Sequence, residues 1–185
     1  MRRTRHLGGY LLQNGMFAPS LIKSIQRGTI ALSLVTSNTA TIASVNVAHT
    51  RLVYLGTRDL GAATTPDLVA CRVALTNATT VTAFVNTAAN VVVSFEVIQY
   101  VPGVIKSVQR GTLTTTTSAT GTATITSVNT AKSKLDYLGF TTTWTATTHI
   151  GLVLGHVELT NATTVTFDGN ASIDRTVGYQ VAAFY

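Results

Sequence analysis

The sequence is short of charge, cysteine and long hydrophobic runs. Charged residues make up 11% of the 185 residues and hydrophobic residues 45%, whereas roughly a quarter of an ordinary soluble domain is charged. Disorder requires low hydrophobicity together with high net charge, so the chain is expected to fold. No stretch approaches the roughly 20 apolar residues that span a bilayer, so membrane insertion is not expected.

Groups for acid–base or metal chemistry are also scarce, with one cysteine, four histidines and seven carboxylate side chains. No phosphate-binding loop or nucleophile elbow is recognisable. A hydrolase would need Asp136 and Glu158 in one cleft, and their spacing does not bring them together. We therefore expect no enzyme, no cofactor and no metal. Cys71 stands in the apolar run 68–73, which predicts a small buried thiol without a disulfide partner.

Neutral polar residues replace the missing charge, and threonine leads them with 35 residues. Threonine and valine favour the pleated surface of a sheet, because their branched β-carbons lose rotamers in a helix. Segments such as 91–98 and 122–128 alternate with a period of two or read as covered strands, and glycine and asparagine separate the segments. These patterns predict an all-β fold.

An internal repeat is the most informative feature. The octapeptide at 22–29, Ile-Lys-Ser-Ile-Gln-Arg-Gly-Thr, returns at 105–112 with one valine for isoleucine. From 22 to 56, about 19 of 35 positions are identical at an offset of 83. The segment 75–82 recurs at an offset of 84, and 91–100 aligns at 85. Small length changes in loops would explain the growing offset.

The repeat predicts two tandem antiparallel β-sandwich or jelly-roll-like domains with six or seven strands each. We expect a basic N-terminal arm at 1–20, a first repeat at 21–101 and a second repeat at 104–185. Pro102 and Gly103 form the junction, because proline cannot donate to a ladder and glycine permits a turn. A unit of about 80 residues buries only a modest core, so the repeats are expected to pack against each other or against other chains.

The whole chain has a formal net charge of +6, and part of the positive charge lies in its first residues. A basic arm can bind an acidic protein surface, nucleic acid or anionic lipid. The rest of the chain lacks the basic patch with interleaved aromatics typical of a nucleic-acid groove, so no nucleic-acid binding is expected. The arm also lacks the continuous apolar core of a secretory signal. Its candidate partner-binding residues are Arg2, Arg3, Arg5, Tyr10, Met16 and Phe17.

Three polar residues recur where the first strand of each repeat begins. One interpretation is an intersubunit or interdomain contact, because the planar fork of arginine can bind two acceptors. The other is inheritance from a common ancestor at a solvated strand edge, where lysine discourages unwanted pairing. The residues are Lys23, Gln26 and Arg27 in the first repeat, and Lys106, Gln109 and Arg110 in the second.

The two repeats differ most at 60–67 and 141–149. The second stretch holds the single tryptophan, Trp144, among threonines. A tryptophan ring can stack on the apolar face of a sugar, and it is also a common anchor of cores and interfaces. Trp144 is therefore the candidate for a loop that contacts a host surface glycan.

The repeated motif resembles small threonine-rich β proteins encoded among the structural genes of tailed bacteriophages. The resemblance rests on Ile-Lys-Ser-Ile/Val-Gln-Arg-Gly-Thr, Ser-Val-Asn and Tyr-Leu-Gly, and it covers about residues 22–56 and 105–139. It implies a virion component. Together with the poor secretory signal, it predicts a protein that is made in the host bacterial cytoplasm and is not secreted. It implies no catalytic residue.

One function and one alternative are expected from these observations. The first is a non-enzymatic structural component of a tailed-phage virion that binds itself and other virion proteins. Both a capsid-surface decoration and a tail or fibre-attachment protein fit this description. The alternative is a host-receptor or glycan-binding module of the tail, which would bind host polysaccharide through the Trp144 loop.

Overall fold

The computed structural model describes residues 20–61, 63–116, 118–145 and 153–185. Strands make up 68% of the structure and helices 6%, and the antiparallel strands form two sheets. The predicted all-β class is therefore confirmed. Threonine, valine and alanine dominate the strands, as their β-branched or small side chains allow.

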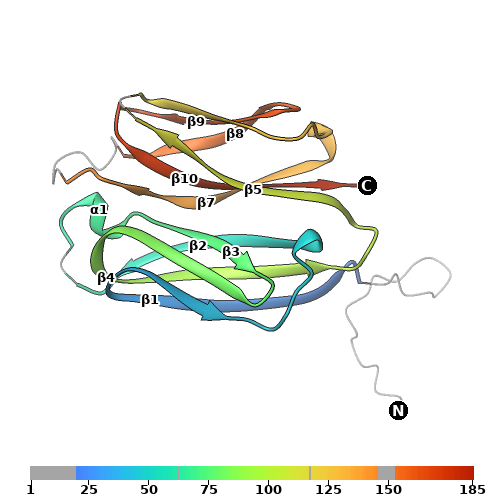
Figure 1. Cartoon of the computed structure of the whole chain (residues 1–185), viewed down its shortest axis with the longest axis horizontal. Helices are drawn as coiled ribbons and strands as arrows, with labels where there is room; N and C mark the ends of the chain where they lie inside the picture. The colour runs from blue at the N-terminus through green and yellow to red at the C-terminus, as the bar shows by residue number, and fades with distance from the viewer. Residues whose placement is uncertain (1–19, 62, 117, 146–152) are drawn as a thin grey trace, which may run out of the picture.

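The first repeat forms two layers from four strands, because two of the strands are long and bend. β1 and β4 pair along nearly their whole lengths. β2 pairs with the second half of β4, and β3 pairs with the first half, so each layer has three strands (Figure 1). The elements are β1 (Ile22–Thr41), η1 (Val47–His49), β2 (Thr50–Asp59), α1 (Pro66–Val69), β3 (Cys71–Asn77) and β4 (Thr80–Tyr100).

The second repeat has the same pairing pattern, with each long strand divided in two. β5 and β6 take the places of the two halves of β1, and β9 and β10 take those of β4. β7 pairs with β10, and β8 pairs with β9. The elements are β5 (Ile105–Thr115), β6 (Thr120–Thr124), η2 (Thr130–Lys132), β7 (Ser133–Thr142), β8 (Gly155–Asn161), β9 (Thr164–Gly169) and β10 (Arg175–Phe184).

The layer of β5, β10 and β7 lies between the rest of the second repeat and the first repeat (Figure 1). On one side it faces the three-stranded sheet β6-β9-β8. On the other side it meets β2 and β3 of the first repeat, and the residue pair Arg72–Gly139 links β3 to β7 in one seven-stranded sheet. The repeats are thus joined by sheet pairing as well as by the turn at 102–104.

Two hydrophobic clusters fill the interior. Phe95 and Leu32 lie in the cluster of the first repeat, and Phe167 and Val177 in that of the second. Leu138 of β7 belongs to the first cluster although it comes from the second repeat. The repeats therefore share core packing, and the division into domains at 21–101 and 104–185 stays a prediction.

The structure corrects the alignment of the closing strands. Phe95 lies against Gly28 on the neighbouring strand, where an added Cβ would meet the ring at 2.7 Å. Tyr179 lies against Gly111 in the same way, where an added Cβ would meet the hydroxyl oxygen at 2.6 Å and the ring at 2.9 Å. Phe95 and Tyr179 are therefore equivalent at an offset of 84, whereas the expected offset of 85 would match Phe95 to Gln180. The contact of an aromatic ring with a glycine on the neighbouring strand marks this register. An alignment of the two amino-acid sequences alone cannot detect the contact.

Candidate protein-binding interface

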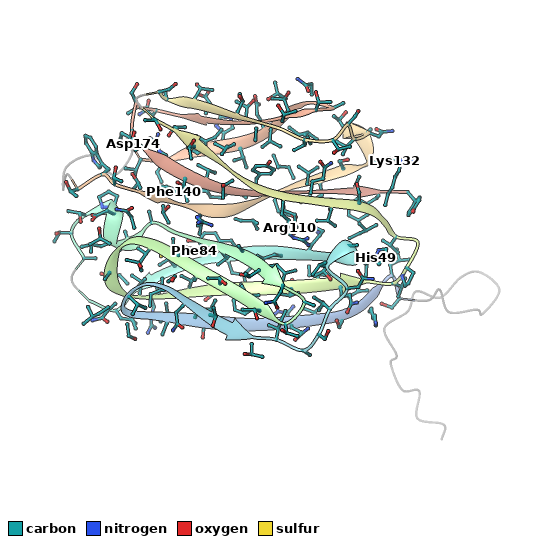
Figure 2. The ribbon with its side chains drawn as sticks, in the orientation of Figure 1. His49, Phe84, Arg110, Lys132, Phe140 and Asp174 are labelled. Atoms are coloured by element: carbon teal, nitrogen blue, oxygen red, sulfur yellow. The ribbon has the colours of Figure 1, made fainter. Side chains whose placement is uncertain are left out.

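Three side chains from adjacent strands meet on the outer face of the β5-β10-β7 layer. Gln180 of β10 is opposite Arg110 of β5 and opposite Asp136 of β7 in the strand register. Alternate residues of β10, such as Tyr179 and Val181, point into the core of the second repeat. Gln180 points the other way, and Figure 2 labels Arg110 in the layer between the two repeats. We call Arg110, Asp136, Leu138 and Gln180 the docking face.

Gln180 satisfies the exposed backbone of a strand edge in the first repeat. β2 pairs with β4 on one side, so its other side carries backbone groups that need partners. The N–H of Leu52 donates to Oε1 of Gln180 at 3.2 Å, and Nε2 of Gln180 donates to the carbonyl of Leu52 at 3.4 Å. The same Nε2 donates to Oδ2 of Asp136 at 2.9 Å. Gln180 is fully buried, and its amide is occupied on both ends.

A buried ion pair crosses the contact beside Gln180. Nε of Arg51 donates to Oδ2 of Asp136 at 2.9 Å, and a second guanidinium nitrogen donates to Oδ1, which makes the pair bidentate. A third nitrogen of Arg51 donates to the Tyr100 hydroxyl at 3.1 Å. Burial alone would lower the pKa of Arg51, but the hydrogen bonds and charge of Asp136 raise it above its usual value. The Arg51 guanidinium is therefore held charged inside the contact.

Arg110 donates hydrogen bonds to one side-chain amide and two backbone carbonyls, which are neutral acceptors. Its Nε donates to Oε1 of Gln180 at 2.9 Å. A terminal nitrogen donates to the carbonyl of Val47 at 3.1 Å and to that of Thr50. Burial lowers the pKa of Arg110 to about 10. The guanidinium thus holds the end of η1 and the start of β2 against the second repeat.

Leu138 and Gly139 bring β7 close to β3. Leu138 is 3% exposed and completes the core of the first repeat. Gly139 has a φ of +83°, and an added Cβ would lie 2.1 Å from the carbonyl oxygen of Cys71. Glycine is required there both by the backbone conformation and by the close approach. On the other strand, the Arg72 guanidinium lies 3.9 Å from the centre of the Phe84 ring.

Cys71 lies at the start of β3 behind this contact and is 1% exposed, so the predicted buried thiol is confirmed. Burial raises the pKa of its thiol to about 11, and a hydrogen bond with Thr57 acts in the opposite direction. The neutral thiol therefore persists over the physiological pH range and acts as a small core residue.

The six repeated polar residues separate into different environments. Gln26 holds the backbone of Ala43, and Gln109 holds that of Thr126, each by two hydrogen bonds of 2.6–3.0 Å. Both contacts stay within one repeat. They hold the segment after β1 in the first repeat and the segment after β6 in the second. The lysines Lys23 and Lys106 are exposed.

The two repeated arginines differ in a way that follows the contact. Arg110 binds the first repeat, whereas Nε of Arg27 pairs with Oε2 of Glu96 at 2.5 Å on the surface. The side chain of Arg27 is 67% exposed. Sequence reasoning did not nominate Arg51, Asp136 as an interface residue, or Gln180. The signal that would have found them is the difference between the repeats, since the first repeat has Val53 and Glu96 where the second has Asp136 and Gln180.

The candidate glycan residue Trp144 lies next to the first repeat. Its carbonyl accepts a hydrogen bond from the N–H of Asp67 in α1 at 3.2 Å. Its N–H donates to Oγ1 of Thr142, also at 3.2 Å. The side chain is half-buried, and its indole nitrogen has no hydrogen-bond partner among the described residues. The Trp144 loop therefore meets the α1 segment at the junction of the repeats.

The other candidate residues give no reacting centre within the described ranges. Asp136 is occupied by Arg51, while Glu158 is exposed on β8 in the other sheet. The described residues hold no group of three or more potential metal ligands. No helix in the described part of the chain is long and apolar enough to cross a membrane. The arm candidates Arg2, Arg3, Arg5, Tyr10, Met16 and Phe17 lie outside the described residues.

The fold and the contact define an all-β protein in which one repeat docks its sheet face on the strand edges of the other. Comparisons of the chain with protein-family models, curated proteins and solved structures found no match in any of the three. The resemblance to phage structural proteins therefore stays an expectation based on the repeated motif.

Proposed function

We propose that this protein is a non-enzymatic structural component of a tailed-phage virion, where it binds neighbouring virion proteins. The contact between the repeats carries the proposal, because it joins a sheet face to strand edges and buries charged and amide side chains. Interfaces with a packed core and satisfied polar groups are the kind that hold subunits together. The virion part of the proposal rests on the repeated motif and its resemblance.

The surface supports a role in assembly. Large apolar side chains stay exposed on both repeats although the chain has few charges. Such residues are normal when they are scattered singly, and they mark partner sites where they form a contiguous patch. The most exposed of them are Leu21, Leu34, Leu55, Leu60, Leu154 and Tyr185.

Two places on a virion suit a chain of two similar repeats. A capsid-surface decoration could bridge two neighbouring subunits, one with each repeat. A tail or fibre-attachment protein could occupy equivalent sites around a ring. In either place, the basic arm would order on another virion protein when it binds.

Fractionated particles of the phage that encodes the chain provide the test. Quantitative mass spectrometry of purified virions, separated into capsids and tails, should find the protein in many copies in one fraction. Its absence from purified particles would overturn the proposal. Saturable binding to host polysaccharide that Trp144→Ala abolishes, with the fold unchanged, would favour the alternative of a glycan-binding module.

A further inference from the structure

The docking face has a counterpart on the first repeat that is exposed at Leu55 among the described residues. Arg27 and Val53 are both opposite Glu96 in the strand register, as Arg110 and Asp136 are both opposite Gln180. At an offset of 83, Leu55 corresponds to Leu138. We call Arg27, Val53, Leu55 and Glu96 the free face. Leu55 is 55% exposed, whereas Leu138 is 3% exposed.

The backbone of the free face is also shaped for a close neighbour. Gly56 corresponds to Gly139 and likewise has a left-handed φ, of +120°. No atom lies within 4 Å of a Cβ added at Gly56, whereas the carbonyl oxygen of Cys71 fills that space at Gly139. Gly56 therefore leaves the same space beside the backbone as Gly139, and no carbonyl of the described residues fills it.

The strand edges that receive the docking face have a counterpart too. In the first repeat these edges are β2 and β3, and the core residues behind them, Leu52 and Val73, are almost fully buried. Their equivalents on β7 and β8, Leu135 and Val157, are only partly buried. We call this side of β7 and β8, at Leu135 and Val157, the open edge; further along β7 the same side is occupied, because Gly139 pairs with Arg72 of the first repeat. Lys134 occupies the place of Arg51 on it and is exposed.

The free face and the open edge each carry a charged group at or beside the position of the buried ion pair, and Glu96 of the free face already pairs with Arg27. Inside the chain, the carboxylate of Asp136 meets Arg51 beside Gln180. On the free face, Val53 replaces the aspartate, but Glu96 replaces the glutamine, so one carboxylate remains. A matching docking would set Glu96 beside Lys134 of another copy. It would also set Arg27 against carbonyls at the end of η2, as Arg110 lies against those of Val47 and Thr50.

We propose that the free face of one copy binds the open edge of a second copy, so that the contact between the repeats continues from chain to chain. Such a contact is heterologous: it leaves one unused face and one unused edge at the ends of every open assembly. Repetition of the same rotation yields either a closed ring or an open filament. The inference deepens the self-binding part of the proposed function, and it can fail while the virion assignment stands.

Sedimentation velocity of the full chain over a range of concentrations tests the proposal. We expect oligomers whose fraction grows with concentration. Leu55→Asp should weaken association by about tenfold or more, because it places a charge in an apolar contact. Leu34→Asp is the matched control: Leu34 is 69% exposed on β1 outside the free face and should leave association unchanged.

A second variant keeps the test independent of misfolding, because it should strengthen association. Val53→Asp together with Glu96→Gln reproduces the polar groups of the docking face on the first repeat, and Lys134→Arg completes the match to Arg51. The triple variant should associate at least about tenfold more tightly than the natural chain, a change that loss of structure cannot imitate. A monomer at every concentration, for the natural and the triple-variant chains alike, would overturn the proposal. Association that Leu55→Asp leaves unchanged would also overturn it. That result is expected if the arm covers the free face in place of a second copy.

Discussion

The amide of Gln180 forms hydrogen bonds with both backbone polar groups of Leu52, at 3.2 and 3.4 Å. A carboxamide offers one acceptor and one donor group, so it can replace a neighbouring strand at a sheet edge. The second repeat thereby covers the unpaired edge of β2 with a side chain, where a sheet would have the backbone of another strand. This contact orients the two repeats, since Asp136 and Arg110 bind the same amide from either side.

Gln180→Leu should lower the free energy of unfolding by about 3 kcal/mol, because it leaves the buried backbone groups of Leu52 and Nε of Arg110 without these partners. Urea unfolding followed by far-UV circular dichroism measures the loss. Glu96→Leu is the matched control at the equivalent position, where the ion pair with Arg27, whose side chain is 67% exposed, is worth about 1 kcal/mol or less. Equal losses for the two variants would contradict a special role for the Gln180 contact.

Removal of one partner of the Arg51–Asp136 pair should destabilise the protein more than removal of both. Arg51→Leu leaves a buried carboxylate, and such a loss typically costs about 3–5 kcal/mol. The double variant with Asp136→Leu removes that penalty and should recover at least about 1 kcal/mol. A double-mutant cycle from urea unfolding measures the coupling. Additive effects would show that the pair does not stabilise the contact.

The sequence was sufficient for the fold class and insufficient for the interface. Alternating threonine and valine predict strands, and the repeat predicts that the same pairing pattern occurs twice. The search for shared residues found Gln26 and Gln109, which each support their own repeat. It missed Asp136 and Gln180, because an internal contact uses the face of one repeat only and the equivalent residues can then diverge. Only the three-dimensional placement of the repeats identifies which differences matter.

Gly139→Ala and Gly56→Ala separate backbone strain from close approach. Both glycines have a left-handed φ, so alanine at either position should cost about 1–3 kcal/mol. At Gly139 the added Cβ also meets the Cys71 carbonyl, and β7 must move away from β3. We therefore expect Gly139→Ala to cost at least about 2 kcal/mol more than Gly56→Ala in thermal or urea unfolding. Similar costs would mean that the close approach is relieved at little expense.

The stability of the protein should fall at alkaline pH. Burial raises the pKa of the Cys71 thiol to about 11 and also raises the pKa values of Tyr54, Tyr137 and Tyr179. A folded-state pKa above the unfolded value means that the neutral form is stabilised on folding, and this contribution is complete below the unfolded pKa, which for cysteine is about 8.5. It is lost as the pH rises from there through about 11.

Cys71→Ala isolates the thiol's share of this pH dependence. The variant has a smaller side chain in the core and should be less stable at every pH, but its free energy of unfolding should fall less steeply between pH 9 and 11. The tyrosines remain in the variant, so part of the fall should persist above about pH 10. Urea midpoints measured from pH 7 to 11 give both slopes. Parallel curves for the variant and the natural chain would show that Cys71 ionises equally well in the folded and unfolded protein, which its near-complete burial behind the contact between the repeats argues against.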